Sequence, residues 1–137
     1  MISATSFEGQ TADLTSIWKE HHALVLPSRA EGLPLALVEA MMCGRPCVVT
    51  KVGGNAKVVE DGITGFLAAP DEDSIDAALE EAWARRGELR EMGQRAALRI
   101  RELVPANPAE DFADTLLDLA RPSDSRTVIE LGVRVHD

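Results

Sequence analysis

Runs of apolar residues alternate with helix-period patterns along most of this chain. Short, continuous apolar stretches at 23–27 (ALVLP), 46–50 (PCVVT) and 65–69 (GFLAA) are typical of strands that are covered on both faces. A helical pattern separates each of these stretches from the next. Because strand–helix–strand alternation favours parallel pairing, the pattern predicts an α/β domain with a Rossmann-like parallel sheet flanked by helices.

The expected helices follow from start signals and periodicity. Thr11 is expected to cap the first helix, with Leu14, Ile17 and Trp18 facing inward, and Asp71 is expected to cap a long one. A short strand is expected at 2–7, ahead of the first helix. The predicted helices span 11–22, 34–44, 55–60, 73–86, 88–103 and 107–120.

The segment 28–44 is mostly apolar, yet it carries Glu31 and Glu39. Pro34 suits the first helical position, which leaves Glu31 in the preceding loop and Glu39 in the second turn of the helix. An ionised carboxylate in a buried helix costs several kcal/mol, by the rough figure for desolvation, unless it is paired or faces a polar cavity. Glu39 therefore requires a partner, either within the protein or on a ligand.

The start of this helix is the predicted binding site. The N–H groups of Gly32, Leu33, Leu35 and Ala36 are expected to lack partners, and the helix dipole adds positive potential there. This point also follows a parallel strand, at the end of the sheet where α/β domains bind ligands. The pattern predicts an anion site, and Gly32 would let a phosphate approach the backbone closely.

The two glutamates fit a ligand that carries hydroxyl groups beside its phosphates. Helical side chains lean toward the helix N-terminus, so the carboxylate of Glu39 reaches back toward the anion site and could accept from a ribose diol. Glu31 would then contact a sugar hydroxyl. An alternative stays open for each residue. Glu31 could be a solvated loop carboxylate, and Glu39 could be satisfied by a buried arginine or by backbone N–H groups.

The segment 26–67 closely resembles the donor-binding half of retaining GT-B glycosyltransferases of the group 1, or family 4, type, which includes sucrose and mannosyl transferases. The matching pieces are P-S-x-x-E-G-x-P, two glutamates separated by seven residues, E-A-M-x-x-G-x-P, and V-G-G followed by D-G-x-T-G. Weaker similarity extends over 7–120. The resemblance implies a partial C-terminal GT-B domain that is truncated on its N-terminal side.

The resemblance also implies roles for individual residues. Glu31 would contact the donor sugar as the catalytic-site residue, Glu39 would bind the ribose, and the backbone at 32–35 would hold the diphosphate beside a glycine turn. The implied donor-binding residues are Ser28, Gly32, Leu33, Leu35, Glu39, Lys51, Gly53 and Gly54. The expected ligand is a nucleoside diphosphate sugar, with no metal and no cofactor.

The chain departs from the family pattern in three respects. Lys57 stands where a glutamate is usual, and His22 stands where an aspartate is common before the strand. Lys57 could add positive charge near the phosphates, although we interpret it as a surface helix residue, and we interpret His22 as a helix-end histidine. The family's Arg and Lys that clamp the diphosphate come from earlier strands, so only Arg29 and Lys51 are near the motif, with Lys51 the better candidate for a phosphate contact.

The composition of the chain limits the classes of molecule that it could bind. The chain has 137 residues and a formal net charge of −9, which disfavours nucleic acid and anionic membrane surfaces as partners. No apolar run approaches the roughly 18 residues of a membrane span, and the start is no signal peptide. Cys43 and Cys47 have no cluster of His or Cys around them, so we expect free thiols in a reducing, cytoplasmic setting and no zinc.

Two functions of different classes follow. The first is the donor-binding part of a retaining glycosyltransferase, an enzyme of carbohydrate biosynthesis, in which this chain alone is inactive because the acceptor domain lies outside it. The alternative is a non-catalytic module that keeps the fold for nucleotide binding or for association. We expect an incomplete nucleotide-sugar-binding domain at 1–120, and a linker and tail at 121–137. The alternating segment 129–135 (IELGVRV) is predicted to pair as a strand with an exposed sheet edge, in its own chain or in a neighbouring one, and we expect a homodimer.

Overall fold

The computed structural model describes residues 5–7, 9 and 13–120. Contacts divide the chain into two compact units, 1–104 and 105–137. The predicted cap Thr11 and the predicted tail strand at 129–135 lie outside the described residues. Among the described residues, no helix is both long enough and apolar enough to cross a membrane.

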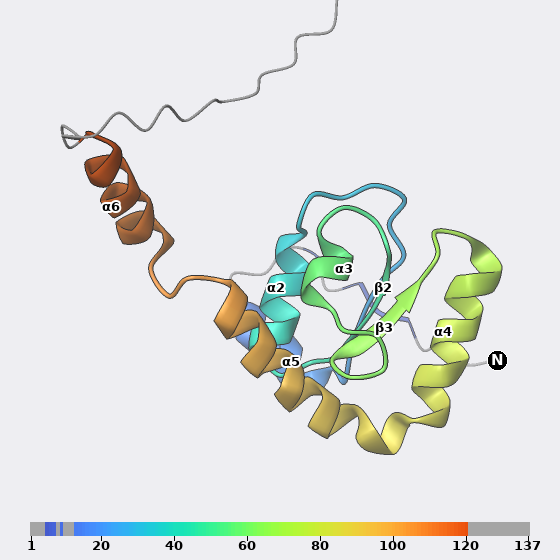
Figure 1. The fold of residues 1–137 in the computed structure, drawn as a ribbon. Coiled ribbons are helices and arrows are strands. Elements are labelled where there is room, and N and C mark those ends of the chain that lie inside the picture. Colours follow the sequence, from blue (N-terminus) through green and yellow to red (C-terminus); the bar gives the residue numbers. More distant parts are fainter. Residues whose placement is uncertain (1–4, 8, 10–12, 121–137) are drawn as a thin grey trace, which may run out of the picture. The chain divides into compact units, whose positions relative to one another are not determined.

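The first unit is built on a three-stranded sheet. Strands β1 (Leu24–Leu26), β2 (Cys47–Thr50) and β3 (Gly65–Ala68) lie side by side in that order, and both pairs are parallel. Val25 is level with Val48, which is level with Phe66. The three apolar stretches therefore form the strands that the sequence predicts, and the α/β parallel fold is confirmed (Figure 1).

Helices cover the two faces of the sheet (Figure 1). On one face, α2 (Leu35–Met42), α3 (Asn55–Val58) and α5 (Leu89–Leu103) enclose a core around Leu37, Val49 and Ile100. On the other face, α4 (Glu72–Ala84) packs its buried Ala78 against Val48 and Phe66. Both faces of β2 are buried, which is why its sequence shows no polar alternation.

The N-terminal predictions need correction. Residues 5–7 form no strand, although the sequence predicted one over 2–7. Helix α1 (Leu14–Glu20) begins after Asp13, whose Oδ1 accepts from the Ser16 N–H at 3.2 Å, so Asp13 is the N-cap rather than Thr11. Leu14 is 40% exposed instead of facing inward, whereas Trp18 packs against the core.

The remaining helix starts match the sequence more closely. Asp71 caps α4 as predicted, because its Oδ1 accepts from the Ser74 N–H at 2.8 Å. Pro34 is the N-cap of α2 rather than its first residue, so the helix begins one position later than predicted, and a short 3₁₀ turn, η1 (Arg86–Glu88), precedes α5. In the second unit, α6 (Pro108–Ala120) is a separate amphipathic helix that exposes Phe112 and Leu116.

The D-G-x-T-G segment is a structural loop. The Asp61 carboxylate accepts from the Leu67 N–H at 2.9 Å, and the Thr64 hydroxyl accepts from the Glu60 N–H at 2.8 Å. Gly62 has φ +73°, and a side chain at Gly65 would collide with the neighbouring strand. These residues bring the start of β3 against β2, so the motif has a structural role in the sheet.

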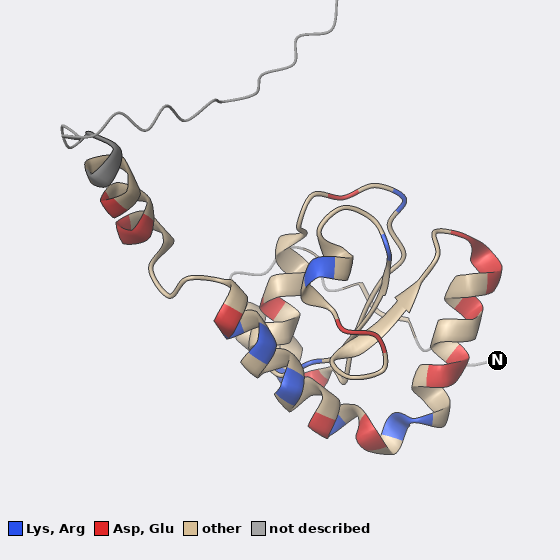
Figure 2. Ribbon diagram, in the orientation of Figure 1, with Lys and Arg blue, Asp and Glu red and all other residues tan. Residues whose placement is uncertain are grey.

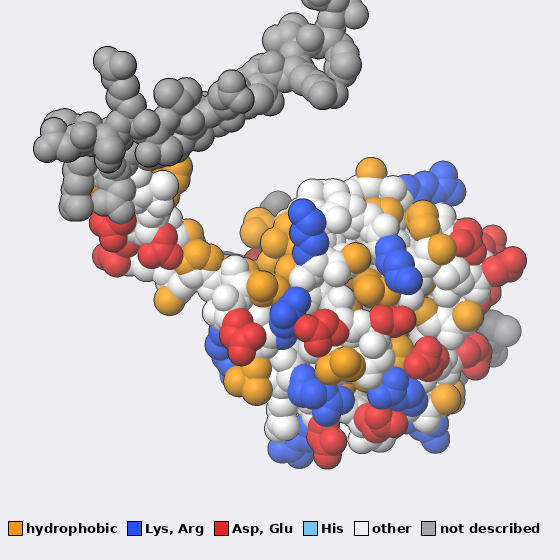
Figure 3. Space-filling model, viewed as in Figure 1, with side chains coloured by type: hydrophobic (Ala, Val, Ile, Leu, Met, Phe, Trp, Pro, Cys, Tyr) orange, Lys and Arg blue, Asp and Glu red, His pale blue; other side chains and the backbone are white. Residues whose placement is uncertain are grey.

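Arg85, the C-cap residue of α4, and Arg95 on α5 hold the same loop from outside, and Arg99 on α5 holds α3. Arg85 donates to the Gly62 carbonyl at 3.0 Å, Arg95 to the Ile63 carbonyl at 2.9 Å, and Arg99 to the Lys57 carbonyl at 3.2 Å. On the face seen in Figure 3, acidic and basic side chains are interspersed rather than gathered into a patch of one sign.

Candidate functional site: the carboxyl ends of the strands

The candidate site lies where β1 and β2 end. The loop at 27–34 leads from β1 to α2, and the turn at 51–54 leads from β2 to α3. The loop after β1 carries charges of both signs in Figure 2, which come from Arg29 and Glu31. The carboxyl ends of parallel strands are the usual place for ligands in such sheets.

The two loops touch through their glycines. Gly53 has φ +53°, and a Cβ there would collide with the carbonyl oxygens of Glu31 and Gly32. The Gly54 N–H donates to the Gly32 carbonyl at 2.5 Å, and a Cβ on Gly54 would lie 3.3 Å from the Leu33 side chain. The V-G-G motif therefore fixes the backbone just ahead of α2, because only glycine fits this contact.

A chain of buried and partly buried hydrogen bonds also links the loops. The Asn55 side-chain amide donates to the Thr50 carbonyl at 2.9 Å, and the Thr50 hydroxyl donates to the Ser28 carbonyl at 2.5 Å. The Ser28 hydroxyl in turn donates to the Glu31 Oε1 at 2.6 Å. Glu31 is thus held by a partner within its own loop, rather than being a freely solvated carboxylate.

Sequence reasoning missed two members of this chain, Thr50 and Asn55. Both are fully buried, and the Oδ1 of Asn55 has no hydrogen-bond partner. A signal was available, because a polar residue at the end of an apolar strand must satisfy its hydroxyl group somewhere. The sequence alone does not reveal that this partner is the loop that follows the neighbouring strand.

The start of α2 presents unused N–H donors. The Leu37 and Val38 N–H groups both donate to the Pro34 carbonyl, at 3.1 and 3.3 Å. In the described part of the chain, none of the four preceding N–H groups predicted to be free donates to a protein acceptor; these belong to Gly32, Leu33, Leu35 and Ala36. Leu35 is 76% exposed, so the approach from solvent is open.

Glu39 is half-buried in the second turn of α2. Within the described residues, its carboxylate forms no ion pair and accepts no hydrogen bond from backbone or side chain. The buried arginine or backbone partner that the sequence left open as an alternative is therefore not present there. Its carboxylate keeps its acceptor capacity for another group.

The nearby cations differ in their surroundings. Lys51 follows β2 directly, is exposed, and has no ion-pair partner within the described residues. Arg29 instead lines a cavity of about 320 Å³ together with Asp71, Glu72 and Asp76, so its charge is offset. Lys57 is exposed on α3, in agreement with its interpretation as a surface residue.

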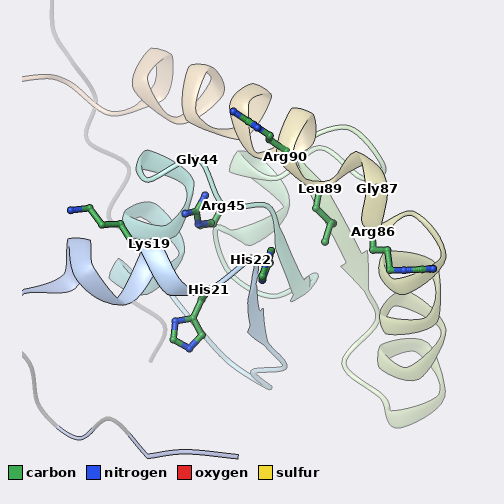
Figure 4. A pocket seen from close by; sticks show the side chains of 9 residues that line it. All are labelled: Lys19, His21, His22, Gly44, Arg45, Arg86, Gly87, Leu89 and Arg90. Carbon is green, nitrogen blue, oxygen red and sulfur yellow. The ribbon is translucent and has the colours of Figure 1, made fainter. Parts of the chain in front are cut away.

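A second polar cavity, of about 400 Å³, lies at the opposite, amino end of the strands. Figure 4 shows its lining, in which Lys19, Arg86 and Arg90 point away from one another. Arg45 donates to the Trp18 carbonyl at 2.6 Å, and Arg86 donates to the Trp83 carbonyl at 2.9 Å. His22 is exposed here, just before β1, and thus at the end of the sheet opposite Glu31.

In the described regions, no group of three or more His, Cys, Asp or Glu side chains is arranged to hold a metal ion. Cys43 is exposed and Cys47 is buried, and both are free thiols. Burial raises the pKa of the Cys47 thiol to about 12. Cys47 therefore has the properties of an inert core residue.

Comparison with known proteins identifies the family of this chain. The model of the family "Glycosyl transferases group 1" matches residues 2–85. A UDP-Gal:alpha-D-GlcNAc-diphosphoundecaprenol alpha-1,3-galactosyltransferase from Escherichia coli is 42% identical over 72 residues, which are 52% of this chain and 19% of that protein. A D-inositol 3-phosphate glycosyltransferase from Saccharomonospora viridis is 34% identical over 124 residues, 90% of this chain and 20% of that protein.

Solved structures agree with the family match. A sucrose-phosphate synthase from Thermosynechococcus elongatus superposes with a TM-score of 0.69 at 26% identity, covering 75% of this chain and 26% of that one. Anabaena HepE in complex with UDP-glucose gives a TM-score of 0.59 at 28% identity, covering 69% and 27%. The chain thus spans only about a fifth to a quarter of the length of these proteins.

Proposed function

Because this chain belongs to the group 1 glycosyl transferases, we propose that it binds a nucleoside diphosphate sugar, the donor of the sugar transfer, at the start of α2. One observation carries the proposal. The free N–H groups at the start of α2 stand beside a loop that Gly53 and Gly54 hold in place. Such a helix start favours a diphosphate through its donors and through its dipole.

The diphosphate would occupy the N–H groups of Leu33, Leu35 and Ala36. Gly32 allows close approach, since a Cβ there would meet nothing within 4 Å on the protein side. Lys51 would add a positive charge from the neighbouring turn. The solved complex of Anabaena HepE with UDP-glucose, from a chain 28% identical to this one, supports a ligand of this class.

The two glutamates would bind the groups on either side of the diphosphate. Glu39, with its carboxylate unpaired, would accept hydrogen bonds from the ribose diol. Glu31 would accept from a hydroxyl of the donor sugar through the carboxylate that Ser28 orients. Both residues are hydrogen-bond acceptors, so neither would contact a phosphate oxygen.

In the complete enzyme, the bond between the anomeric carbon and the diphosphate oxygen would break, and an acceptor hydroxyl would attach with retention of configuration. This chain would hold the leaving diphosphate and orient the sugar, which lowers the barrier by positioning and electrostatics. The acceptor site would come from a domain outside these residues. We infer a cytoplasmic, reducing setting, since both cysteines are free thiols.

The direct test is a thermal melt with and without UDP, GDP and ADP. A ligand that binds only the folded state raises its melting temperature, so at least one nucleotide should do so. Glu39→Gln should melt like the parent chain without ligand and should lose most of the ligand-induced rise. Glu102→Gln, an exposed change on α5, is the control and should keep it. The proposal fails if no nucleotide raises the melting temperature, or if Glu39→Gln responds like Glu102→Gln.

A second candidate function is binding without transfer. It is favoured by the scarcity of positive charge near the helix start, since Arg29 lies among acidic side chains and Lys51 is the one lysine in the adjoining turn at 51–54. We expect the purified chain to show no turnover on any nucleotide sugar, because one carboxylate cannot orient two substrates. Product formation above a Glu31→Gln control would refute this expectation.

A further inference from the structure

The turn at 51–54 is closed by a buried amide side chain. Asn55, the first residue of α3, is 0% exposed, and its Nδ2 donates to the Thr50 carbonyl at 2.9 Å. The same carbonyl accepts from the Val52 N–H at 2.9 Å, and the Asn55 N–H donates to the Val52 carbonyl at 3.2 Å. Asn55 therefore joins the end of β2 to the start of α3 through its side chain as well as through its backbone.

The closed turn is also the part of the domain that touches the loop ahead of α2 (Figure 1). Gly54, which directly precedes Asn55, donates to the Gly32 carbonyl, and a Cβ at Gly53 would collide with the Glu31 carbonyl. Glycine has no side chain that could hold its own backbone in place, so the path of the turn depends on its neighbours. Asn55 is the neighbour whose side chain fixes it.

The contact that Asn55 makes requires a hydrogen-bond donor. A side-chain amide has a donor end and an acceptor end, and a carbonyl oxygen pairs only with the donor. In the described part of the chain, the acceptor Oδ1 is buried without a partner. Because an unpaired buried acceptor is unfavourable, an apolar side chain of similar shape would pack there at a lower cost. Packing therefore does not explain the amide, whereas its donation to the Thr50 carbonyl does.

We propose that Asn55 is a positioning residue for the donor site, an inference that rests on the proposed function. By holding the Thr50 carbonyl, its amide fixes the turn at 51–54. Gly54 then fixes the Gly32 carbonyl, and with it the N–H groups ahead of α2 that would receive the diphosphate. Asn55 does not touch the ligand, because its side chain is fully buried.

This role differs from that of the Thr50 hydroxyl group, which reaches Glu31 through Ser28 and so concerns the sugar. Asn55 acts on the backbone that would hold the diphosphate, which the nucleotide and the nucleotide sugar share. Loss of its donor should therefore weaken the binding of UDP and of UDP-glucose by the same factor. The ratio of the two affinities separates the role of Asn55 from that of the hydroxyl group.

The variant Asn55→Asp tests the inference, because protonation alone switches its donor on and off. The neutral carboxyl group can donate to the Thr50 carbonyl as the amide does, whereas the carboxylate brings a second acceptor against it. Burial and the facing carbonyl both raise the pKa of this carboxyl group above the ordinary value of an aspartate. Titration calorimetry should give an affinity for UDP within about twofold of the parent chain at about pH 5, and at least about tenfold weaker at about pH 8. Each affinity is compared with that of the parent chain at the same pH, which removes the titration of the nucleotide and of Glu31 and Glu39.

Two further variants complete the test. Asn55→Leu has a similar shape and no donor, so circular dichroism should show a folded chain that binds UDP at least about tenfold more weakly at both pH values. Asn107→Asp makes the same chemical change at an exposed position. It is the matched control, and it should bind UDP like the parent chain at both pH values.

The possible failures are distinguishable. An affinity equal to that of the parent chain in Asn55→Leu would overturn the inference, as would an equal affinity in Asn55→Asp at both pH values. So would a loss confined to UDP-glucose, since Asn55 would then act through Glu31. If the parent chain itself binds no nucleotide, the proposed function fails and the inference fails with it. A parent chain that binds UDP beside unaffected variants contradicts the inference alone.

Discussion

The two ends of the parallel sheet differ in the groups that carry positive charge, which are backbone N–H groups at one end and side chains at the other. At the carboxyl ends of β1 and β2, the positive groups are the free backbone N–H groups at the start of α2, accompanied by two carboxylates and Lys51. At the amino ends lies a cavity lined by four cationic side chains, two histidines and no acid; these are Lys19, Arg45, Arg86, Arg90, His21 and His22. If the number of cationic side chains decided where an anion binds, the anion would bind at the amino ends of the strands.

Helix direction reverses that conclusion. Arg45 donates to a carbonyl in the last turn of α1, and Arg86 donates to one in the last turn of α4. These cations are used to satisfy helix C-termini, whose dipoles are negative. The start of α2 offers donors that no protein group uses. The polarity of the backbone, rather than the distribution of Lys and Arg, is therefore the basis on which we place the proposed anion site.

The largest expected effect breaks the loop contact at the carboxyl end. Gly53→Ala puts a methyl group into the Glu31 carbonyl at a positive φ, so it should lower the free energy of unfolding by about 3 kcal/mol or more. Gly32→Ala meets open space and should fold normally but bind UDP more weakly, because the methyl group occupies the path of the phosphate.

Urea melts and titrations with UDP separate these two effects. Gly87→Ala, which also meets open space but lies near the amino end, is the control for both measurements and should change neither. If Gly53→Ala is as stable as Gly87→Ala, the tight approach of the two loops is not what holds the site.

A second prediction contrasts one cation from each end. Arg45→Ala removes a charged donor from the half-buried Trp18 carbonyl and should cost about 1–3 kcal/mol of stability while leaving the affinity for UDP unchanged. Lys51→Ala should change stability by less than about 0.5 kcal/mol and weaken UDP binding several-fold. The opposite pattern would mean that the basic cavity, and not the start of α2, receives the anion.

Much of this fold could be predicted from local signals. The three apolar stretches gave the strands to within one residue at each end, because strands buried on both faces need no polar alternation. Asp71 was recognisable as a cap, since an acidic residue before a helical pattern satisfies the first free N–H groups. The start of α1 was misjudged because Thr11 and Asp13 both suit an N-cap, and propensity does not choose between them.

The site was only partly accessible in this way. Glu39 could be named because a carboxylate in an apolar helix conflicts with its surroundings, whereas Gly53 and Gly54 were named through the family resemblance, which also supplied most of the case for Glu31. Thr50 and Asn55 could not be assigned to the site, since their partners come from loops that the sheet brings together. The position of β2 between β1 and β3 also depends on strand order, which no local pattern encodes.

The third prediction tests the buried link between the loops. Thr50→Val removes the hydroxyl group that donates to the Ser28 carbonyl and should cost about 1–2 kcal/mol, because a buried acceptor is left without its donor. It should also weaken binding of a nucleotide sugar more than binding of the nucleotide alone, since the Ser28 hydroxyl orients Glu31. Thr50→Ser keeps the hydroxyl group and should restore the affinity for the sugar. Equal losses for both ligands would show that Thr50 does not act through Glu31.

The smallest effect concerns the thiols near the amino end, where no change in binding is expected. Burial raises the pKa of the Cys47 thiol to about 12, so at pH 9 about one molecule in a thousand carries the thiolate. Cys43 is exposed and should react alone with a thiol reagent in native protein, whereas both should react in urea. Because the folded-state pKa lies above the unfolded value, this group favours folding below about pH 9 and loses that contribution between pH 9 and 12. Labelling followed by mass spectrometry measures the count, with Cys43→Ser as the control that should give no label. Two labels on native parent protein at pH 8 would mean that the base of β2 opens beneath the basic cavity, and that the amino end is less rigid than its capped helices imply.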